Sequence, residues 1–439
     1  MPKAPKRVKS TGKGHSGTTL SPSGSFVRAR QSDGHRRALQ SLVRAADDHG
    51  RRPDNDDVRP RRRRPKGKQP TQEANMFKTP LSVYTGKGTW KSYEPDSTSS
   101  ASIGATTTIP WTSLRLVTYN TWSSSPNYSQ AQSRALLMVL ESSQADVISL
   151  QEVSHPLQTQ LRSADWVRKH YLLTRLEDFW FVSRKGGSVQ VQKLRGVGKK
   201  EGTREGVLML VRKGLLEQRG WEAQVEYISM QRNQDEKDKA IILLRMMDSE
   251  GGEQVSIDGG VKDWQKLPAL TSVQSCLVQW RIATSHYSSL PTCDQIRQHQ
   301  YRQTLRLLQQ KPTPRSSAIL SDFNANSELE FAPFLASKWV DSHLLARCLS
   351  EPPDFREEST FGHLYPFVPG QRDGKPRKPR RIDRIYLGGE AKALAMSADG
   401  RMGTDPIFGD NGCKLKDVNG DEMFPSDHEG VWVELELGR

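Results

Sequence analysis

The sequence has few cysteines and no long apolar run. Its 439 residues include four cysteines, none of them in a Cys-x-x-Cys pair, so we expect a reducing compartment and neither a disulfide framework nor a structural zinc site. No stretch approaches the ~20 consecutive apolar residues that cross a bilayer. The first residues also lack the apolar core of a secretory signal. We therefore expect no association with a membrane.

Apolar residues are also scarce in residues 1–108, whereas positive charge is abundant there. Residues 1–75 hold 19 Lys and Arg against 7 Asp and Glu, so 12 of the 15 net positive charges lie in this segment. Such a composition cannot bury enough apolar surface to offset the entropy lost on ordering. We therefore expect residues 1–108 to be a disordered basic tail and residues 109–439 to form one folded domain.

The run RPRRRRPKGK, Arg59 to Lys68, is the most basic part of this tail. Such a run is typical of a nuclear localisation signal or a nucleic-acid contact, and it is as common in tails that are only solvated. The first interpretation predicts a nuclear protein, with a cytoplasmic pool left open. The sequence does not identify protein partners of the tail. It contains no internal repeat, and we expect a monomer.

Regular structure is predicted from about residue 111 onward. Residues 114–122 and 145–153 have the apolar pattern of strands, and residues 129–144 between them have helical spacing. Further strands are predicted at 205–212, 240–247, 275–287, 317–324, 381–389 and 430–437, with a helix at 293–310. Alternating strands and helices predict an α/β fold.

Five of these strands end at, or begin just after, a short polar segment. The segments contain Asn120, Glu152, His286, Asp322 with Asn324, and Asp427 with His428. Strand ends are where α/β folds gather reacting groups. Each segment alone also fits an ordinary role, such as a turn, a cap or a solvated loop. Together, in this order, they predict one common site.

Three of the segments resemble the diagnostic motifs of the endonuclease/exonuclease/phosphatase superfamily. They are LQEV at 150–153, SDFN at 321–324 and PSDH at 425–428. The match covers about residues 111–439. It implies that the α/β fold is a four-layer sandwich of two mixed β-sheets flanked by helices. The pattern of strands and helices alone does not distinguish this fold from a doubly wound sheet.

The resemblance also implies a metal-dependent phosphodiesterase. Glu152 offers a hard carboxylate suited to Mg²⁺, with Mn²⁺ as a substitute, and its family equivalent binds the metal. Asp322 is expected to position and deprotonate the attacking water. Asn324 would lie on the same side of an extended segment as Asp322 and hold that water or a phosphate oxygen. A hydrogen-donating His428 would stabilise the charge that develops on the phosphate.

The remaining candidates have supporting roles. Asn120 is expected to contact a phosphate oxygen or a metal-bound water, and His286 to contact the phosphate. Asp427 is expected to orient polar neighbours and the metal site. Asp383 lies in a further family segment and would orient another group, unless it forms a structural ion pair with Arg381 or Arg384. The expected substrate contacts are Arg297, Phe361 and Arg381. The alternative for Arg297 is a solvated position on the helix surface. Arg381 belongs to the loop Lys375–Arg381, which either holds a nucleic-acid backbone or is only an exposed loop.

Within the superfamily, three segments look most like the 5′-tyrosyl-DNA phosphodiesterases. They are TSH at 284–286, RIDRIYL at 381–387 and FPSDHEGVWVEL at 424–435. The chain departs from that group in having TYN for TWN and SDFN for GDTN, and it lacks the Arg that follows GDTNL. The resemblance implies a DNA substrate with a 5′-phosphotyrosyl end left by a stalled topoisomerase. The alternatives are an AP endonuclease, an exonuclease, a small-phosphoester phosphatase, or a nucleic-acid-binding module without turnover.

Overall fold

The computed structural model describes a large part of the chain. The described residues are 76–93, 112–174, 182–191, 205–230, 240–248, 278–347, 359–365, 376–409, 411–417 and 420–437, except positions 87, 124, 126, 186, 187, 291 and 395. The basic run Arg59–Lys68 lies outside them. None of the helices in these segments has both the length and the apolar character needed to cross a bilayer.

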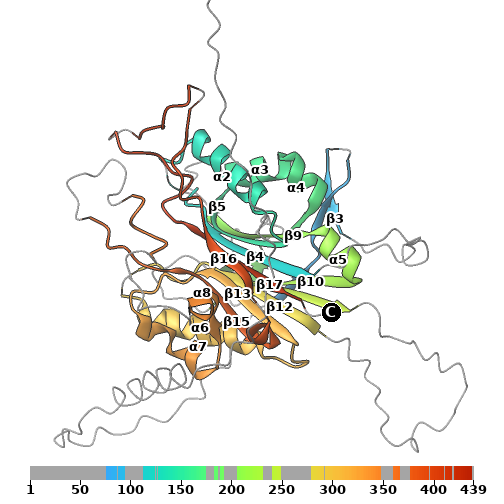
Figure 1. Ribbon diagram of the computed structural model, residues 1–439. Coiled ribbons are helices and arrows are strands. Elements are labelled where there is room, and N and C mark those ends of the chain that lie inside the picture. The colour runs from blue at the N-terminus through green and yellow to red at the C-terminus, as the bar shows by residue number, and fades with distance from the viewer. Residues whose placement is uncertain are drawn as a thin grey trace, which may run out of the picture.

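Two mixed β-sheets form the centre of the described structure (Figure 1). The order of strands in the first sheet is β1 (Met76–Thr79), β10 (Trp221–Ser229), β11 (Ala240–Asp248), β12 (Val278–Ser285), β13 (Ser316–Asp322), β15 (Asp383–Gly389) and β14 (Val340–Asp341). The order in the second is β16 (Met396–Met402), β17 (Gly430–Glu436), β4 (Ser113–Asn120), β5 (Val147–Ser154), β9 (Glu205–Arg212), β6 (Tyr171–Leu173), β2 (Ser82–Tyr84) and β3 (Trp90–Ser92). Strands β7 (Val182–Lys185) and β8 (Ser188–Val191) form a separate two-stranded sheet among the described residues.

Helices cover the outer faces of both sheets, which gives the four layers seen in Figure 1. The second sheet is covered by α2 (Gln130–Ser143), α3 (His155–Ser163) and α4 (Asp165–His170), whose leucines and valine cluster with those of β4, β5 and β9. The first sheet is covered by α6 (Asp294–Leu308), η2 (Glu328–Phe331) and α7 (Ala332–Ala336) through a second cluster rich in aromatic rings. The remaining helices of the described segments are α5 (Lys213–Arg219), α8 (Ser342–Arg347) and η3 (Glu390–Ala393). The predicted fold class is confirmed.

The space between the sheets changes from apolar to polar along the strands. Leu114 and Leu116 of β4 belong to a buried cluster that also includes residues of β12 and β13. Nearer the carboxyl ends, Gln151 Nε2 donates to the hydroxyl oxygens of Ser149 and Thr284 at 3.0 and 3.2 Å. Buried polar groups that satisfy one another in this way rigidify a core. The two sheets are thus joined by side-chain hydrogen bonds at the edge where the polar strand ends lie.

Part of the segment expected to be a disordered tail belongs to the fold. Strand β1 pairs with β10, and β2 pairs with β3 and β6. Leu81, between β1 and β2, is buried in the cluster between the sheets. The prediction of disorder is therefore wrong for residues 76–93, because these short strands gain their stability from neighbours distant in sequence. The rest of that prediction falls on residues outside the described segments.

Candidate active site

The predicted polar residues meet at one edge of the two sheets. Asn120 and Asp322 are the last residues of β4 and β13, Glu152 lies in β5, and His286 follows β12. Strands β4 and β5 run parallel, as do β12 and β13, so the carboxyl ends of each pair lie together. The side-chain nitrogen Nδ2 of Asn120 donates to Asp322 Oδ2 at 2.8 Å. This bond joins the polar edges of the two sheets.

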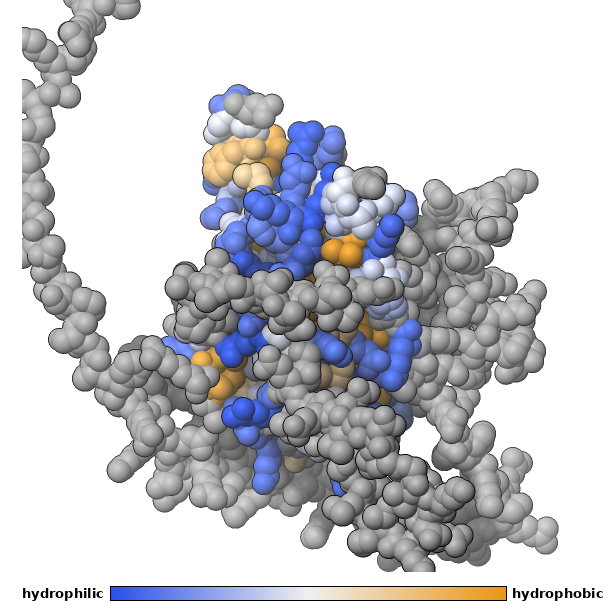
Figure 2. Space-filling model, turned by 90° about the vertical axis from the view of Figure 1, so that its right-hand side faces the viewer, coloured by the Kyte–Doolittle hydropathy of each residue, from blue (hydrophilic) through white to orange (hydrophobic). Residues whose placement is uncertain are grey.

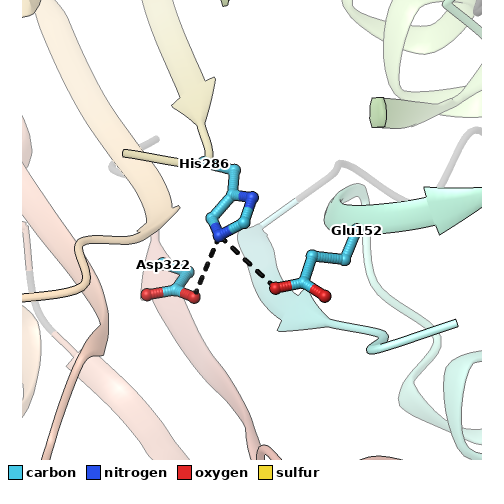
Figure 3. Close-up of side chains that lie close together, drawn as sticks. All are labelled: Glu152, His286 and Asp322. Carbon is cyan, nitrogen blue, oxygen red and sulfur yellow. Dashed lines mark ion pairs between the residues drawn. The ribbon is translucent and has the colours of Figure 1, made fainter. Parts of the chain in front are cut away.

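Glu152, His286 and Asp322 point toward one another (Figure 3). His286 Nε2 lies 3.4 Å from Glu152 Oε1 and 3.7 Å from Asp322 Oδ2, and Asn120 Nδ2 donates to Glu152 Oε1 at 3.1 Å. One ligand atom from each of the three residues lies within 4.8 Å of the others, and only Glu152 is partly exposed. Accessible carboxylate oxygens suit Mg²⁺ or Mn²⁺. These residues therefore fit a divalent cation held by Glu152.

Two residues of the site have a backbone conformation that is rare outside glycine. Glu152 has φ 53° and Asn324 has φ 51°, both in the left-handed region. The Asn324 N–H donates to Asp322 Oδ1 at 2.8 Å, and its side-chain amide donates to the Tyr287 carbonyl at 3.2 Å. The expectation of an extended segment from Asp322 to Asn324 is therefore wrong. The chain turns at Asn324 instead, which brings its backbone N–H to the Asp322 carboxylate.

His428 is held by a second carboxylate. Its Nδ1 lies 2.8 Å from Asp383 Oδ2, which also accepts a hydrogen bond from Thr360 Oγ1 at 2.8 Å. The Asp383 backbone N–H donates in turn to Thr360 Oγ1 at 3.1 Å. This contact is what an orienting role for Asp383 requires. The alternative ion pair with Arg381 or Arg384 does not form, since both arginines bind Asp341.

Two buried side chains of the site, His428 and Asp322, have shifted pKa values. Burial lowers the pKa of His428, but the charges of Asp383 and Asp427 outweigh burial and raise it to about 10. Burial also raises the pKa of Asp322 to about 6, and the charge of Asp383 adds to this shift. At neutral pH the site therefore holds a cationic imidazole and an ionised carboxylate whose proton affinity is higher than usual. A base with a pKa near the working pH is well suited to proton transfer.

Asp383→Asn is expected to move the alkaline limb of the pH–rate profile to lower pH. The carboxylate of Asp383 favours protonated His428, so its removal lowers the pKa of His428 from about 10. The protonated form, and with it the rate, is then lost earlier as the pH rises. The measurement is kcat/KM between pH 6 and 11 for both proteins. An unchanged alkaline limb would show that this carboxylate does not control His428.

The turn before β17 ties His428 to the end of β4, the neighbouring strand of the same sheet. Ser426 Oγ donates to the Asn120 carbonyl at 2.8 Å and accepts the His428 N–H at 3.2 Å. Asp427 Oδ2 accepts from Arg377 Nη1 at 2.5 Å, while its Oδ1 lies 3.8 Å from His428 Nε2. Ser426 and Asp427 thus position His428 beside Asn120.

Phe361 and two arginines lie next to His428. The ring centroids of Phe361 and His428 are 4.8 Å apart. Arg377 Cζ and Arg380 Cζ lie 5.0 and 5.3 Å from the centroid of the Phe361 ring. The loop predicted to bind a nucleic-acid backbone therefore runs beside the site in its described part, residues 376–381. Lys375, at the start of the loop, lies outside the described residues.

Two predicted substrate contacts are instead used inside the fold. Arg381 forms an ion pair with Asp341. Arg297 has no exposed surface, binds Glu330 through Nε and Nη2 at 2.6 and 3.1 Å, and donates from Nη1 to two backbone carbonyls. The predictions of a substrate contact are wrong for both residues because their guanidinium groups are engaged by these carboxylates. The alternative prediction, that Arg297 lies on solvated helix surface, is also wrong, because the residue is fully buried.

Arg297→Ala is expected to lower the free energy of unfolding by about 3–5 kcal/mol, because it leaves Glu330 buried without its partner. The KM of the folded enzyme should not change. Chemical denaturation and steady-state kinetics test this, with Arg302→Ala on the exposed face of the same helix as control. Unchanged stability together with a tenfold rise in KM would restore Arg297 as a substrate contact.

Thr360, Arg377 and Trp122 were not singled out from the sequence. Thr360 supports Asp383, and Arg377 binds Asp427. The Trp122 N–H donates to Asn120 Oδ1 at 3.0 Å. No sequence signal marks Thr360, whereas Trp122 lies two residues after the polar strand end at Asn120 and Arg377 belongs to the arginine-rich loop.

Comparison with known proteins places the chain in a broad enzyme group. The model of the Endonuclease/Exonuclease/phosphatase family matches residues 117–428. A search of curated proteins finds no significant match. A solved structure of D. rerio TDP2 with a single-strand DNA product is 16% identical, with a TM-score of 0.47 over 74% of this chain and 99% of that one. The human Nocturnin catalytic domain with bound sulfate is 16% identical, with a TM-score of 0.44 over 74% and 94%.

Proposed function

The chain belongs to the endonuclease/exonuclease/phosphatase family, and from this premise we propose that it is a Mg²⁺-dependent phosphodiesterase acting on 5′-phosphotyrosyl DNA ends. The observation that carries the proposal is the convergence of Glu152 and Asp322 on Asn120, with the His428–Asp383 pair beside them. A phosphodiester resists attack because of its negative charge and its poor leaving group. This site offers a base, carboxylates that would hold a divalent cation, and hydrogen-bond donors for one phosphate.

Asp322 is the base of the proposed mechanism. Hydrogen bonds from Asn120 and from the Asn324 backbone hold its two carboxylate oxygens, which fixes the direction in which it takes a proton from water. Its pKa of about 6 keeps it ionised at neutral pH. The second hydrogen of the Asn324 amide can donate to that water or to a phosphate oxygen.

His428 is the donor that faces the developing charge. Its Nδ1–H points to Asp383, so Nε2 is left to donate to a phosphate oxygen. His286, beside both carboxylates, can donate to a second phosphate oxygen. Glu152 would hold the divalent cation, which when bound neutralises phosphate charge and stabilises the leaving oxygen. Hydrolysis by this arrangement leaves a 5′-phosphate on the DNA.

The choice of substrate is supported by the segments TSH, RIDRIYL and FPSDHEGVWVEL, and by the two arginines next to Phe361. The test is a panel of a 5′-tyrosyl oligonucleotide, an abasic duplex, poly(A) and an inositol phosphate, each with Mg²⁺ and with EDTA. We expect Mg²⁺-dependent release of tyrosine at the highest kcat/KM of the panel. A higher kcat/KM on another substrate of the panel would assign that activity to the protein instead. If none of the substrates is turned over, the protein is a binding module without catalysis.

The basic run Arg59–Lys68 supports a nuclear site of action on DNA. Replacing Arg61–Arg64 by alanine should lower the nuclear-to-cytoplasmic ratio of a fluorescent fusion several-fold, because import receptors bind clustered positive charge. Catalytic turnover in vitro on a mononucleotide ester should not change. Equal nuclear signal from both proteins would remove this role from the run.

A further inference from the structure

A third residue beside the site shares the rare backbone conformation of Glu152 and Asn324. Trp122 has φ 49° and lies two residues after Asn120. A left-handed backbone is unfavourable for a bulky side chain, and such strain collects at functional sites. The other non-glycine residues with positive φ in the described part, Gln144 and Lys338, follow helix ends, where this conformation is common. Trp122 therefore shares with Glu152 and Asn324 a strained backbone that no helix end explains.

The indole of Trp122 lies among aromatic and cationic groups. Its ring centroid is 5.7 Å from that of Tyr365, at an interplanar angle of 45°. Arg377 Cζ lies 5.8 Å from the Trp122 ring and 5.0 Å from the Phe361 ring. Arg377 itself is fixed by Asp427, next to His428. Trp122 and Phe361 are thus linked through one guanidinium at the side of the reacting groups.

These groups have a definite preference for a ligand. Trp122 is half-buried, so its side chain keeps part of its surface open. Aromatic side chains bind planar rings by stacking, and a guanidinium stacks on aromatic faces while attracting anions. The charge of Arg377 is balanced by Asp427, so the guanidinium acts here through stacking, and the anionic part of a ligand would lie at the neighbouring phosphate site. The preferred ligand is therefore a planar aromatic ring attached to an anionic group.

We propose that Trp122 and Arg377 form a subsite that binds a planar aromatic ring carried by the phosphate ester. The inference rests on the proposed function only in placing a phosphate at Asn120, Glu152 and Asp322. The ring has two possible sources in such an ester, the aromatic leaving group and the adjacent nucleobase. The two share their chemistry and differ in which side of the phosphate they occupy.

The test is equilibrium binding of three phosphate monoesters in the presence of Mg²⁺. Phenyl phosphate carries an aryl ring, thymidine 5′-monophosphate carries a nucleobase, and methyl phosphate carries no ring. The variants are Trp122→Leu and Trp122→Phe. The matched control is Trp432→Leu, because Trp432 is also half-buried and also has an arginine, Arg115, over its ring, at 5.2 Å, but lies on β17 four residues beyond His428.

Trp122→Leu should raise the Kd of at least one ring-bearing ligand about tenfold, the usual effect of losing one stacking partner. The Kd of methyl phosphate should not change, and Trp122→Phe should restore most of the affinity. A loss for phenyl phosphate alone assigns the leaving group, a loss for the nucleotide alone assigns the nucleobase, and a loss for both shows that either ring fits. Trp432→Leu should change none of the three.

Two results would overturn the subsite. One is equal affinity of Trp122→Leu and wild type for both ring-bearing ligands. The other is an equal loss for methyl phosphate, which would show that Trp122 acts only by supporting the phosphate site. Because binding is measured without turnover, these results are separate from those of the substrate panel. Failure to cleave the tyrosyl ester would refute the proposed substrate and leave the subsite to be decided by binding.

Discussion

Asp322→Asn should lower kcat by a factor of about 10²–10⁴, the usual contribution of a general base. The amide keeps the size of the carboxylate but cannot take the proton of the attacking water. Single-turnover kinetics on the preferred member of the substrate panel would measure the loss. Substrate affinity should change little, because the groups placed to bind the phosphate remain.

The same substitution should change the melting temperature by only a few degrees. It removes a disfavoured charge, but it also removes one of the two hydrogen bonds that the carboxylate accepts from Asn120 and from the Asn324 backbone. Burial and the charge of Asp383 raise the pKa of Asp322 to about 6, so its ionised form is disfavoured in the fold, and a neutral amide removes that cost at pH 7. Asp165→Asn, at a fully exposed acid, is the control. Unchanged turnover would take the role of base away from Asp322, whereas lost turnover with lost folding would leave Asp322 a structural residue.

Glu152→Gln should raise the Mg²⁺ concentration needed for half-maximal activity by a factor of about 10–100 or more, since even indirect supports of a metal contribute this much to affinity. Part of the lost rate should return at high Mg²⁺. Titration of the rate with Mg²⁺, and direct binding of Mn²⁺ followed by paramagnetic resonance, measure the effect. The matched control is Glu141→Gln, at an exposed acid of α2. The same metal dependence in wild type and Glu152→Gln would place the cation elsewhere.

The strands buried on both faces were the predictable part of the fold. Strands β9 and β11 contain nearly continuous apolar runs, as strands covered on both sides do. Strand β10 was missed because WEAQVEYIS contains charged residues, and the buried one, Glu226, is neutralised by Arg245 of the neighbouring strand at 2.7 Å. Strands β1, β2 and β3 were missed because each has at most four residues.

The sequence predicts the site residues that lie at the ends of apolar strands. It does not predict which side chains pair with each other when they are distant in sequence. Asn120, Glu152 and Asp322 were found from their positions after apolar runs. The sequence does not show that Arg297 meets Glu330 or that Arg381 meets Asp341, so both arginines were placed on the substrate. A left-handed backbone leaves no mark in the sequence, so the pattern predicts an extended segment at Asn324 and no role for Trp122.

The most direct test of the account is the position of a divalent cation in crystals grown with Mn²⁺ and phosphate, located by its anomalous scattering. The account predicts a peak about 2.2 Å from a carboxylate oxygen of Glu152, with the phosphate between Asp322 and His428. A peak that avoids Glu152, or a phosphate that Asp322 and His428 cannot both reach, would contradict it.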